Sequence, residues 1–310
     1  MSSGSTPLLL SPSQVHNLTR SNKPVAFLDA SWVMPNSSRK PYNEFLAKRI
    51  PGAQFLDVDE VSSPHPLGLK HMMPTGRVFA DACEAFGIEP SSHVVIYDTS
   101  GVFSSPRALF MFRTFGHSNS SIINGGLPAW MDLGLPVESG PLTKTRTVRY
   151  ETPLLDTEAL RNYDEIVANS QEPSTSSRTS LVLDARARGR YLGQEPEPRP
   201  GLASGHIPRS LSLPFNLFLK KNAAKDGTEF TTLLPEPDLK VALADAIGAE
   251  HTTHIMQGLM PVITSCGSGM TAAVLWLGLK CLGVEKVSLY DESWTGYAMR
   301  PTSKIETINT

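Results

Sequence analysis

The residue best suited to chemistry is Cys266, at which an apolar run ends and a glycine-rich turn begins. The stretch reads PVITSCGSGMTA from Pro261 to Ala272, with glycines at positions 267 and 269. Glycines let backbone N–H groups point inward, and the helix expected from Thr271 adds the positive potential of its N-terminus. Such a loop stabilises an anion bonded at the cysteine, whether a thiolate or a persulfide. We therefore expect a nucleophilic cysteine at the mouth of its domain.

Other reactions that use a loop of this kind need residues that the sequence lacks. A Cys-x5-Arg phosphatase needs an arginine at position 272, which is alanine, and a phosphate-binding P-loop needs a lysine after its last glycine. A thiol protease needs a histidine base, and nothing in the pattern singles one out. The two remaining cysteines, Cys83 and Cys281, are predicted to be small core residues.

Composition restricts the partners and the compartment. The chain has 310 residues, a formal net charge of −2 and three cysteines without a CxxC pair. These values argue against nucleic acid or an anionic membrane as the main partner, and they favour a reducing compartment with free thiols. The first residues lack the basic region of a secretory signal, and no apolar run approaches the length of a membrane span. We expect the cytosol, with the mitochondrion as a second address.

Four segments of the first half recur in the same order in the second half, which indicates a duplicated domain. The pairs are AFLDASW and LVLDARA, RIPGAQFLDVD and GHIPRSLSLPF, HVVIYDTSG and PVITSCGSG, and IINGGLPAW and SLYDESW. The polar, Pro- and Gly-containing stretch between the halves reads as a linker. We place the domains at 1–140 and 159–310, with the linker at 141–158. A second polar patch, at Ser170–Ser180, is predicted to be a surface loop.

Short β-rich runs alternate with helical patterns in both halves. The predicted strands are Val25–Leu28, Val94–Tyr97, Leu181–Leu183, Val262–Thr264 and Val287–Tyr290. The predicted helices are Phe79–Phe86, Ala108–Phe115, Leu239–Ala246 and Thr271–Leu282. This alternation predicts an α/β fold with parallel sheets covered by helices on both faces. Reactive groups gather at the carboxyl ends of such strands, where Cys266 stands.

At these residues the chain resembles the tandem rhodanese-like sulfurtransferases over nearly its whole length. The loop CGSGMTA is similar to the CGSG[VA]TA of the branch that acts on 3-mercaptopyruvate, whereas the thiosulfate branch has a CRKGVT style of loop. LDASW, HMMP, YDTSG, GHIP and YDESW also match. The resemblance implies two rhodanese-like domains, each a parallel sheet flanked by helices, with the active site in the cleft between them. Asp98 then replaces the cysteine in the first, non-catalytic domain.

The resemblance also implies the roles of individual residues. Arg190 and Arg199 are expected to hold the carboxylate and keto oxygen of the substrate, which suits a guanidinium fork. Ser268, His71 and Asp59 match a proposed proton relay. The N–H groups from Gly267 to Thr271, including Gly269 and Met270, are expected to hold the persulfide. By contrast, Arg186 and Arg188 are predicted to be solvated surface residues.

The implied reaction moves sulfur from 3-mercaptopyruvate through a Cys266 persulfide to a thiophilic acceptor and releases pyruvate. The family implies thioredoxin, small thiols or cyanide as acceptors, and sulfur-relay proteins such as those of tRNA thiolation, with no metal or organic cofactor. Two alternatives stay open: a thiosulfate:cyanide sulfurtransferase, and a non-enzymatic persulfide carrier. Met270 and Glu292 depart from the family pattern, which affects the predicted substrate preference but not the sulfur chemistry.

Overall fold

The computed structural model describes residues 6–21, 24–142, 145–146, 148–173 and 179–308. The chain divides into two compact units, each built from three segments. Unit 1 comprises Met1–Ser63, Met73–Leu155 and Lys220–Leu233, and unit 2 comprises Pro64–Met72, Asp156–Leu219 and Leu234–Thr310. Each unit therefore takes one short segment from the other half of the sequence. Parts of the predicted Ser170–Ser180 loop and of the 141–158 linker lie outside the described residues, and the domain boundaries stay predictions.

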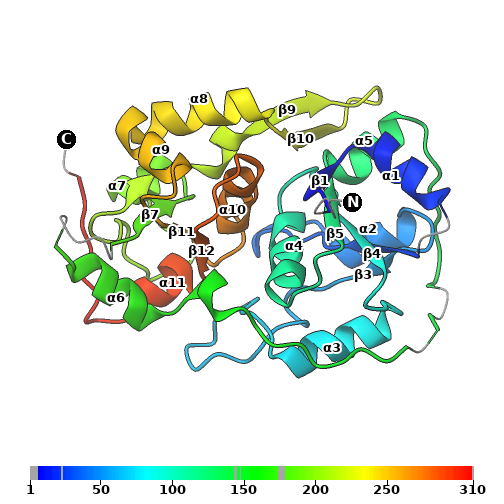
Figure 1. Ribbon diagram of the computed structural model, residues 1–310, viewed down its shortest axis with the longest axis horizontal. Helices are drawn as coiled ribbons and strands as arrows, with labels where there is room; N and C mark the ends of the chain where they lie inside the picture. The colour runs from blue at the N-terminus through cyan, green and yellow to red at the C-terminus, as the bar shows by residue number, and fades with distance from the viewer. Residues whose placement is uncertain (1–5, 22–23, 143–144, 147, 174–178, 309–310) are drawn as a thin grey trace. The chain divides into compact units, whose positions relative to one another are not determined.

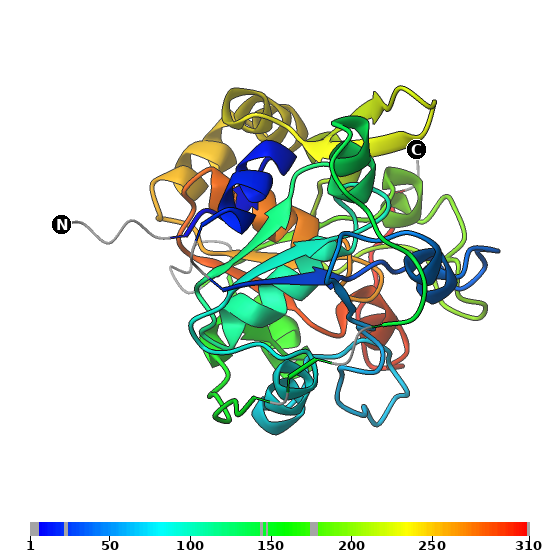
Figure 2. The same cartoon turned by 90° about the vertical axis from the view of Figure 1, so that its right-hand side faces the viewer.

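The sheet of unit 1 has five parallel strands in the order β1-β5-β4-β2-β3. The strands are β1 (Leu9–Leu10), β2 (Val25–Asp29), β3 (Gln54–Phe55), β4 (His93–Tyr97) and β5 (Ser120–Ile123). Figure 2 shows them side by side. All five residues of β4 are buried, because helices cover both faces of a parallel sheet and its central strand meets no water.

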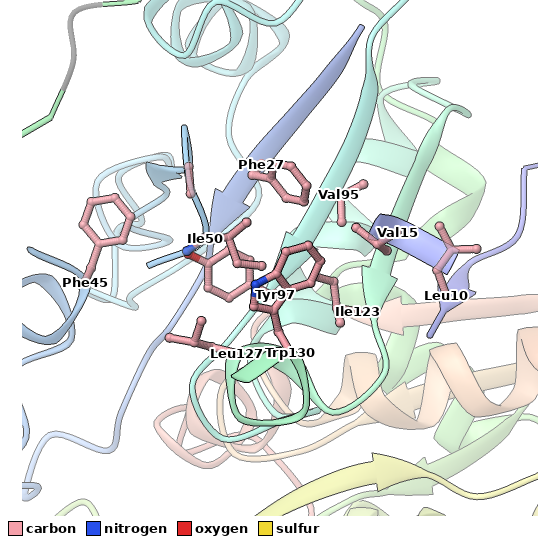
Figure 3. Close-up of a cluster of buried hydrophobic side chains, with 11 residues drawn as sticks. Leu10, Val15, Phe27, Phe45, Ile50, Val95, Tyr97, Ile123, Leu127 and Trp130 are labelled. Atoms are coloured by element: carbon pink, nitrogen blue, oxygen red, sulfur yellow. The ribbon is translucent and has the colours of Figure 1, made fainter. Parts of the chain in front are cut away.

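The helices of unit 1 are α1 (Pro12–Thr19), α2 (Pro41–Ala47), α3 (Gly76–Ala85), α4 (Ser105–Thr114) and α5 (Gly126–Asp132). Alternate residues of the strands point to one face, where Phe27, Val95 and Tyr97 pack with residues of α1, α2 and α5. Figure 3 shows this cluster, with Trp130 of α5 beside the strand residues. The start of α1 is set by Ser11 and Gln14, which form a reciprocal capping box.

The sheet of unit 2 repeats the strand order of unit 1 as β6-β12-β11-β7-β8, again with parallel pairs. Its strands are β6 (Leu160–Arg161), β7 (Leu181–Asp184), β8 (Leu211–Ser212), β11 (Val262–Ser265) and β12 (Val287–Tyr290). Its helices are α6 (Tyr163–Gln171), α7 (Arg188–Leu192), α8 (Glu236–Ile247), α9 (Ala249–Met256), α10 (Ala272–Cys281) and α11 (Ser293–Ala298), with 3-10 turns at Thr157–Ala159 and Phe215–Phe218. The repeated order confirms the duplication.

The strands and helices predicted from the sequence are confirmed, with ends that differ by a few residues. The hairpin of β9 (Leu219–Ala223) and β10 (Glu229–Leu233) was not predicted. In unit 1 its Thr231 donates from the backbone to Ser100 and accepts from Val102, so that it binds the loop after β4. The LKKNA sequence of β9 has only two apolar residues and no alternation, and therefore carries no strand signal. No helix in the described part of the chain is long and apolar enough to cross a membrane.

Candidate active site

Cys266 stands at the first position after β11, which lies between β7 and β12 in the sheet of unit 2 (Figure 1). The loop turns at Gly269, whose φ of +83° favours glycine, and α10 begins at Ala272. The N–H of Gly269 donates to the Cys266 Sγ at 3.1 Å. Within the described residues, the N–H groups of Gly267, Ser268, Met270 and Thr271 have no hydrogen-bond partner. These four N–H groups are therefore available to donate hydrogen bonds to a bound anion.

The N-terminal turn of α11 holds the loop in place. The N–H of Trp294 donates to the carbonyl of Cys266, and that of Thr295 donates to the carbonyl of Gly267, both at 2.9 Å. The hydroxyl of Ser293 accepts the N–H of Cys266 at 3.1 Å and donates to the carbonyl of Tyr290. Ser293 has a φ of +51°, and side chains other than glycine rarely adopt that conformation except where the surrounding structure holds them. The sequence reasoning missed Ser293, although it lies within the YDESW motif.

The thiol is more enclosed than the sequence predicts. Cys266 is only 1% exposed, because the turn at Gly269 and the Ser293 hydroxyl, 4.0 Å from Sγ, surround the sulfur. Gly267 and Ser268, the next residues, are partly exposed. The sequence predicted a thiol at the mouth of the domain; Cys266 directly follows β11, and its thiol is shielded from solvent in this structure.

Two guanidinium groups lie against this loop. A Cβ placed on Gly267 would lie 3.3 Å from Nη2 of Arg190 and 3.7 Å from Nη1 of Arg199. Arg190 belongs to α7, and Arg199 follows it in the loop that leads to β8. The structure therefore brings both predicted substrate-binding arginines to the residue that follows Cys266. A side chain at position 267 would crowd these two guanidinium groups, which explains on steric grounds why a glycine stands there.

Arg186 is buried, so the prediction that it is a solvated surface residue is wrong. Its side chain is 1% exposed, grips Asp184 with Nε and Nη2, and donates from Nη1 to Glu197 at 2.7 Å. The guanidinium also stacks on Trp294 at 4.1 Å. Burial opposes the charged form, but Asp184 and Glu197 outweigh it and raise the pKa of Arg186 above its ordinary value. Arg188 is exposed, as predicted.

The residues of the predicted relay fall in both units. Ser268 is partly exposed in the loop, and His71 is buried on the segment Pro64–Met72 of unit 2, with an unusual φ of +47°. Asp59 is an exposed residue of unit 1, after β3. The relay of these three residues stays a prediction.

Glu292, which stands where the family pattern commonly has a glycine, forms ion pairs with two neighbouring side chains. Its carboxylate binds Arg300 of the chain end at 2.5 Å, and Oε1 lies 3.5 Å from Nε2 of His65. The charge of Glu292 is therefore compensated by Arg300 rather than presented to the cysteine loop. Among the described residues, no group of three or more His, Cys, Asp and Glu side chains is placed to hold a metal ion.

Comparison with known proteins identifies the family of this chain. The model of the rhodanese-like domain matches the chain twice, at residues 11–133 and 164–300. A probable 3-mercaptopyruvate sulfurtransferase of Schizosaccharomyces pombe is 38% identical over 88% of this chain and 86% of its own. The chain belongs to the rhodanese-like sulfurtransferases.

Other rhodanese-like sulfurtransferases are similar over comparable lengths. A thiosulfate sulfurtransferase of Cricetulus griseus is 37% identical over 86% of this chain and 83% of its own. A mitochondrial thiosulfate/3-mercaptopyruvate sulfurtransferase of Arabidopsis thaliana is 35% identical over 91% of this chain and 73% of its own. The crystal structure of the Tum1 protein from Saccharomyces cerevisiae superposes with a TM-score of 0.83 at 28% identity, covering 98% of both chains. These matches confirm the family and the fold predicted from the motifs.

Proposed function

We propose that this protein transfers sulfur from 3-mercaptopyruvate to a thiophilic acceptor through a persulfide on Cys266. The first half-reaction loads the cysteine and releases pyruvate, and the second unloads it. Dividing the transfer in this way is covalent catalysis, and it predicts ping-pong kinetics. The observation that carries the proposal is the loop after β11, where Sγ accepts the N–H of Gly269 and two guanidiniums lie against Gly267.

The loading step balances without an external oxidant or reductant. The Cys266 thiolate attacks the sulfur of the substrate, a sulfur–sulfur bond forms and the carbon–sulfur bond breaks. The electron pair of that bond stays on the carbon, which takes up the proton given up by the substrate thiol and becomes the methyl group of pyruvate. The negative charge ends on the outer sulfur of the persulfide. The free N–H groups of the loop stabilise that charge as oxyanion donors do.

Arg190 and Arg199 bind the planar α-keto acid in this proposal. Guanidinium forks match carboxylate geometry, and both lie beside the residue that follows the nucleophile. Ser268 accepts the thiol proton and passes it on, with His71 and Asp59 as the further members of the relay. The partial exposure of Ser268 on the rim of the loop suits contact with a bound substrate.

Thiosulfate is the competing sulfur donor. The Cricetulus griseus relative is named for it, at 37% identity. In this chain Gly267 and Ser268 stand where the thiosulfate branch has bulky, partly basic residues, and this favours mercaptopyruvate. We place thiosulfate as a secondary donor, with thioredoxin or small thiols as acceptors. A relay protein is the further acceptor we propose, and the cytosol and mitochondrion are the compartments.

The deciding experiment is intact mass spectrometry after incubation with 3-mercaptopyruvate. We expect a gain of one sulfur that maps to the peptide around Cys266, accompanied by one equivalent of pyruvate. Cys266→Ser is the control and should show neither. A sulfur found elsewhere, or pyruvate from the control, would disprove the nucleophile. Loading by a partner desulfurase alone, without pyruvate release, would leave the protein a persulfide carrier.

A further inference from the structure

Four charged side chains near the cysteine loop are linked by consecutive ion pairs. Asp184 at the end of β7 binds Arg186, Arg186 binds one oxygen of Glu197, and the other oxygen of Glu197 binds Arg190. The side chains of Asp184, Arg186 and Glu197 are only 1–2% exposed, and that of Arg190 is 19% exposed. Because buried charges require close partners, each member depends on its neighbours in the chain.

Glu197 orients the guanidinium that faces the loop. Its Oε2 accepts from Nη2 of Arg190 at 2.6 Å and from Nε at 3.2 Å. Nη2 is the same atom that lies nearest to the Cβ position of Gly267. Glu197 therefore fixes Arg190 by one edge and leaves Nη1 for a ligand, while it neutralises much of the charge that the ligand meets.

The charges of this cluster sum to a small positive value. Asp184 and Glu197 balance Arg186 and Arg190, and Arg199 takes part in no ion pair within the described part of the chain. Glu292 and Arg300 balance each other. One net positive charge thus remains beside Gly267, which matches a donor carrying one carboxylate and leaves a dianion half compensated.

We propose that Glu197 sets the charge preference of the site, so that it selects a singly charged sulfur donor over a doubly charged one. The mechanism is the neutralisation of Arg190 at the position where the donor's anionic group binds. This inference rests on the proposed function, because it concerns the donor of the same reaction. It makes Glu197 a positioning and specificity residue rather than a catalytic one, since Arg190 lies between it and the ligand.

The test compares 3-mercaptopyruvate, a monoanion, with thiosulfate, a dianion, in Glu197→Gln. We expect kcat/KM to fall for mercaptopyruvate and to rise for thiosulfate, so that their ratio shifts by about 30-fold toward thiosulfate, mainly through KM. Glu195→Gln is the matched control, because it removes a carboxylate two residues away that is exposed and forms no ion pair within the described residues. An unchanged ratio in Glu197→Gln, or an equal shift in the control, would overturn the inference.

Two further variants separate charge from shape. Glu197→Asp keeps the charge and should slow both donors while leaving their ratio near that of the wild type. Arg199→Gln removes the surplus charge from a partly exposed residue that does not depend on the buried chain, and should weaken thiosulfate more than mercaptopyruvate. If Glu197→Gln does not fold, Arg199→Gln provides the test. An unchanged ratio of the kcat/KM values for mercaptopyruvate and thiosulfate in that variant would contradict the inference.

Binding of unreactive anions distinguishes this inference from the proposed function. Thermal-shift titrations with pyruvate and with sulfate do not require turnover. We expect the wild type to prefer pyruvate, and Glu197→Gln to gain about tenfold in sulfate affinity. If the wild type turns over neither donor but the anion preference shifts, the proposed function fails and the charge assignment survives. If turnover is normal and the preference stays, only the charge assignment fails.

Discussion

The loops after β4 and β11 hold the same place in two sheets of the same strand order, but they begin with different acceptors. In unit 1, Oδ2 of Asp98 accepts three backbone N–H groups and the Ser105 hydroxyl at 2.7–3.0 Å, and Oδ1 accepts the N–H of Ser100. In unit 2, Sγ of Cys266 accepts one backbone N–H group, that of Gly269 at 3.1 Å, and the Ser293 hydroxyl donates to it at 4.0 Å. The carboxylate uses the donors that the cysteine loop leaves free.

The two loops share a backbone arrangement that gathers hydrogen-bond donors. A turn from the end of a central strand into a helix gathers N–H groups around one point, and it stabilises whatever anion stands there. Unit 1 supplies that anion as its own side chain, so its loop is complete and closed by the hairpin residue Thr231. Unit 2 has the shorter side chain of Cys266 instead of a carboxylate, and four N–H groups of its loop have no hydrogen-bond partner among the described residues.

A second pair of equivalent residues differs in the opposite sense, since here the carboxylate of unit 2 is the compensated one. Asp29 and Asp184 end equivalent strands, and position 31 is serine where position 186 is arginine. Asp184 is neutralised by Arg186. Asp29 forms no such ion pair within the described residues: it accepts the N–H of Ser31, and burial raises its pKa to about 7. Unit 1 therefore contains a buried carboxyl that is costly to ionise, whereas unit 2 contains a compensated one.

The largest effect is expected for Cys266→Ser. If the anion of unit 2 arrives through the thiol, pyruvate formation should fall by at least about 10³-fold, because a hydroxyl is a far weaker nucleophile. The thermal unfolding temperature should stay close to that of the wild type, since serine fits the same space. Steady-state pyruvate assays and calorimetry measure the two quantities. Turnover that persists above a hundredth of the wild-type rate would end the comparison between the loops.

Asp29→Asn should change how stability depends on pH. The folded pKa of Asp29, about 7, lies above its unfolded value, so the folded state binds the proton more tightly. The contribution of Asp29 to stability is therefore lost as the pH rises from about 4 to about 7, by up to about 4 kcal/mol, and is constant above that range. Asparagine abolishes this slope, so its advantage should grow toward pH 8. Urea unfolding at pH 5 and pH 8 measures the free energy of unfolding of both proteins. The same difference between them at the two pH values would contradict the prediction.

Asp98→Asn should destabilise unit 1. The amide offers one oxygen and turns an NH2 group toward N–H donors that now lack an acceptor, which costs about 3 kcal/mol of the free energy of unfolding. Urea denaturation measures it. Thr99→Ala on the same loop, whose backbone bonds are kept, is the control. A cost below that of the control would show that the carboxylate is not what closes the loop.

Arg190→Ala and Arg199→Ala should each raise KM for 3-mercaptopyruvate by about 10- to 100-fold, the range for losing a charge-assisted hydrogen bond. Arg188→Ala, on the same helix as Arg190 but exposed, should leave KM unchanged. Initial rates over a range of substrate concentrations measure the effect. An unchanged KM in both variants would move substrate anchoring away from Gly267.

The smallest effect concerns Ser268→Ala. If this hydroxyl takes the proton of the substrate thiol, kcat for mercaptopyruvate should fall by about tenfold, the lower range for general acid–base catalysis. Thiosulfate has no thiol proton, so its rate should change less. Parallel assays with both donors decide the question, and equal slowing would count against the proton-transfer role.

Much of the fold was predictable because its signals are local. The apolar runs at β4 and β11 are buried on both faces, so their composition alone indicates central strands. The repeat of LDA and of the loop motifs indicated the duplication that the two strand orders confirm. The β9–β10 hairpin escaped prediction because its contacts with the loop at Ser100 lie about 130 residues away in sequence.

The candidate site divides in the same manner. Arg190 and Arg199 were predicted from a motif, and the structure places both beside Gly267. Arg186 was predicted to be solvated because an arginine in a polar stretch usually is. Its burial depends on Asp184, Glu197 and Trp294, which converge on it only when the unit is folded. The role of Ser293 could not be predicted for the same reason: its hydroxyl accepts the N–H of Cys266, which lies 27 residues away in sequence.

From the sequence alone come the prediction of the nucleophile and the evidence for the duplicated α/β architecture and the family, because each follows from residue types at short spacing along one segment. The folded structure is needed to see which charges are buried and paired, how far the thiol is enclosed, and that Glu197 holds Arg190. Those properties depend on low-dielectric contacts between segments that are distant in sequence. Arg186 and Arg188, two residues apart and identical in type, differ for that reason alone.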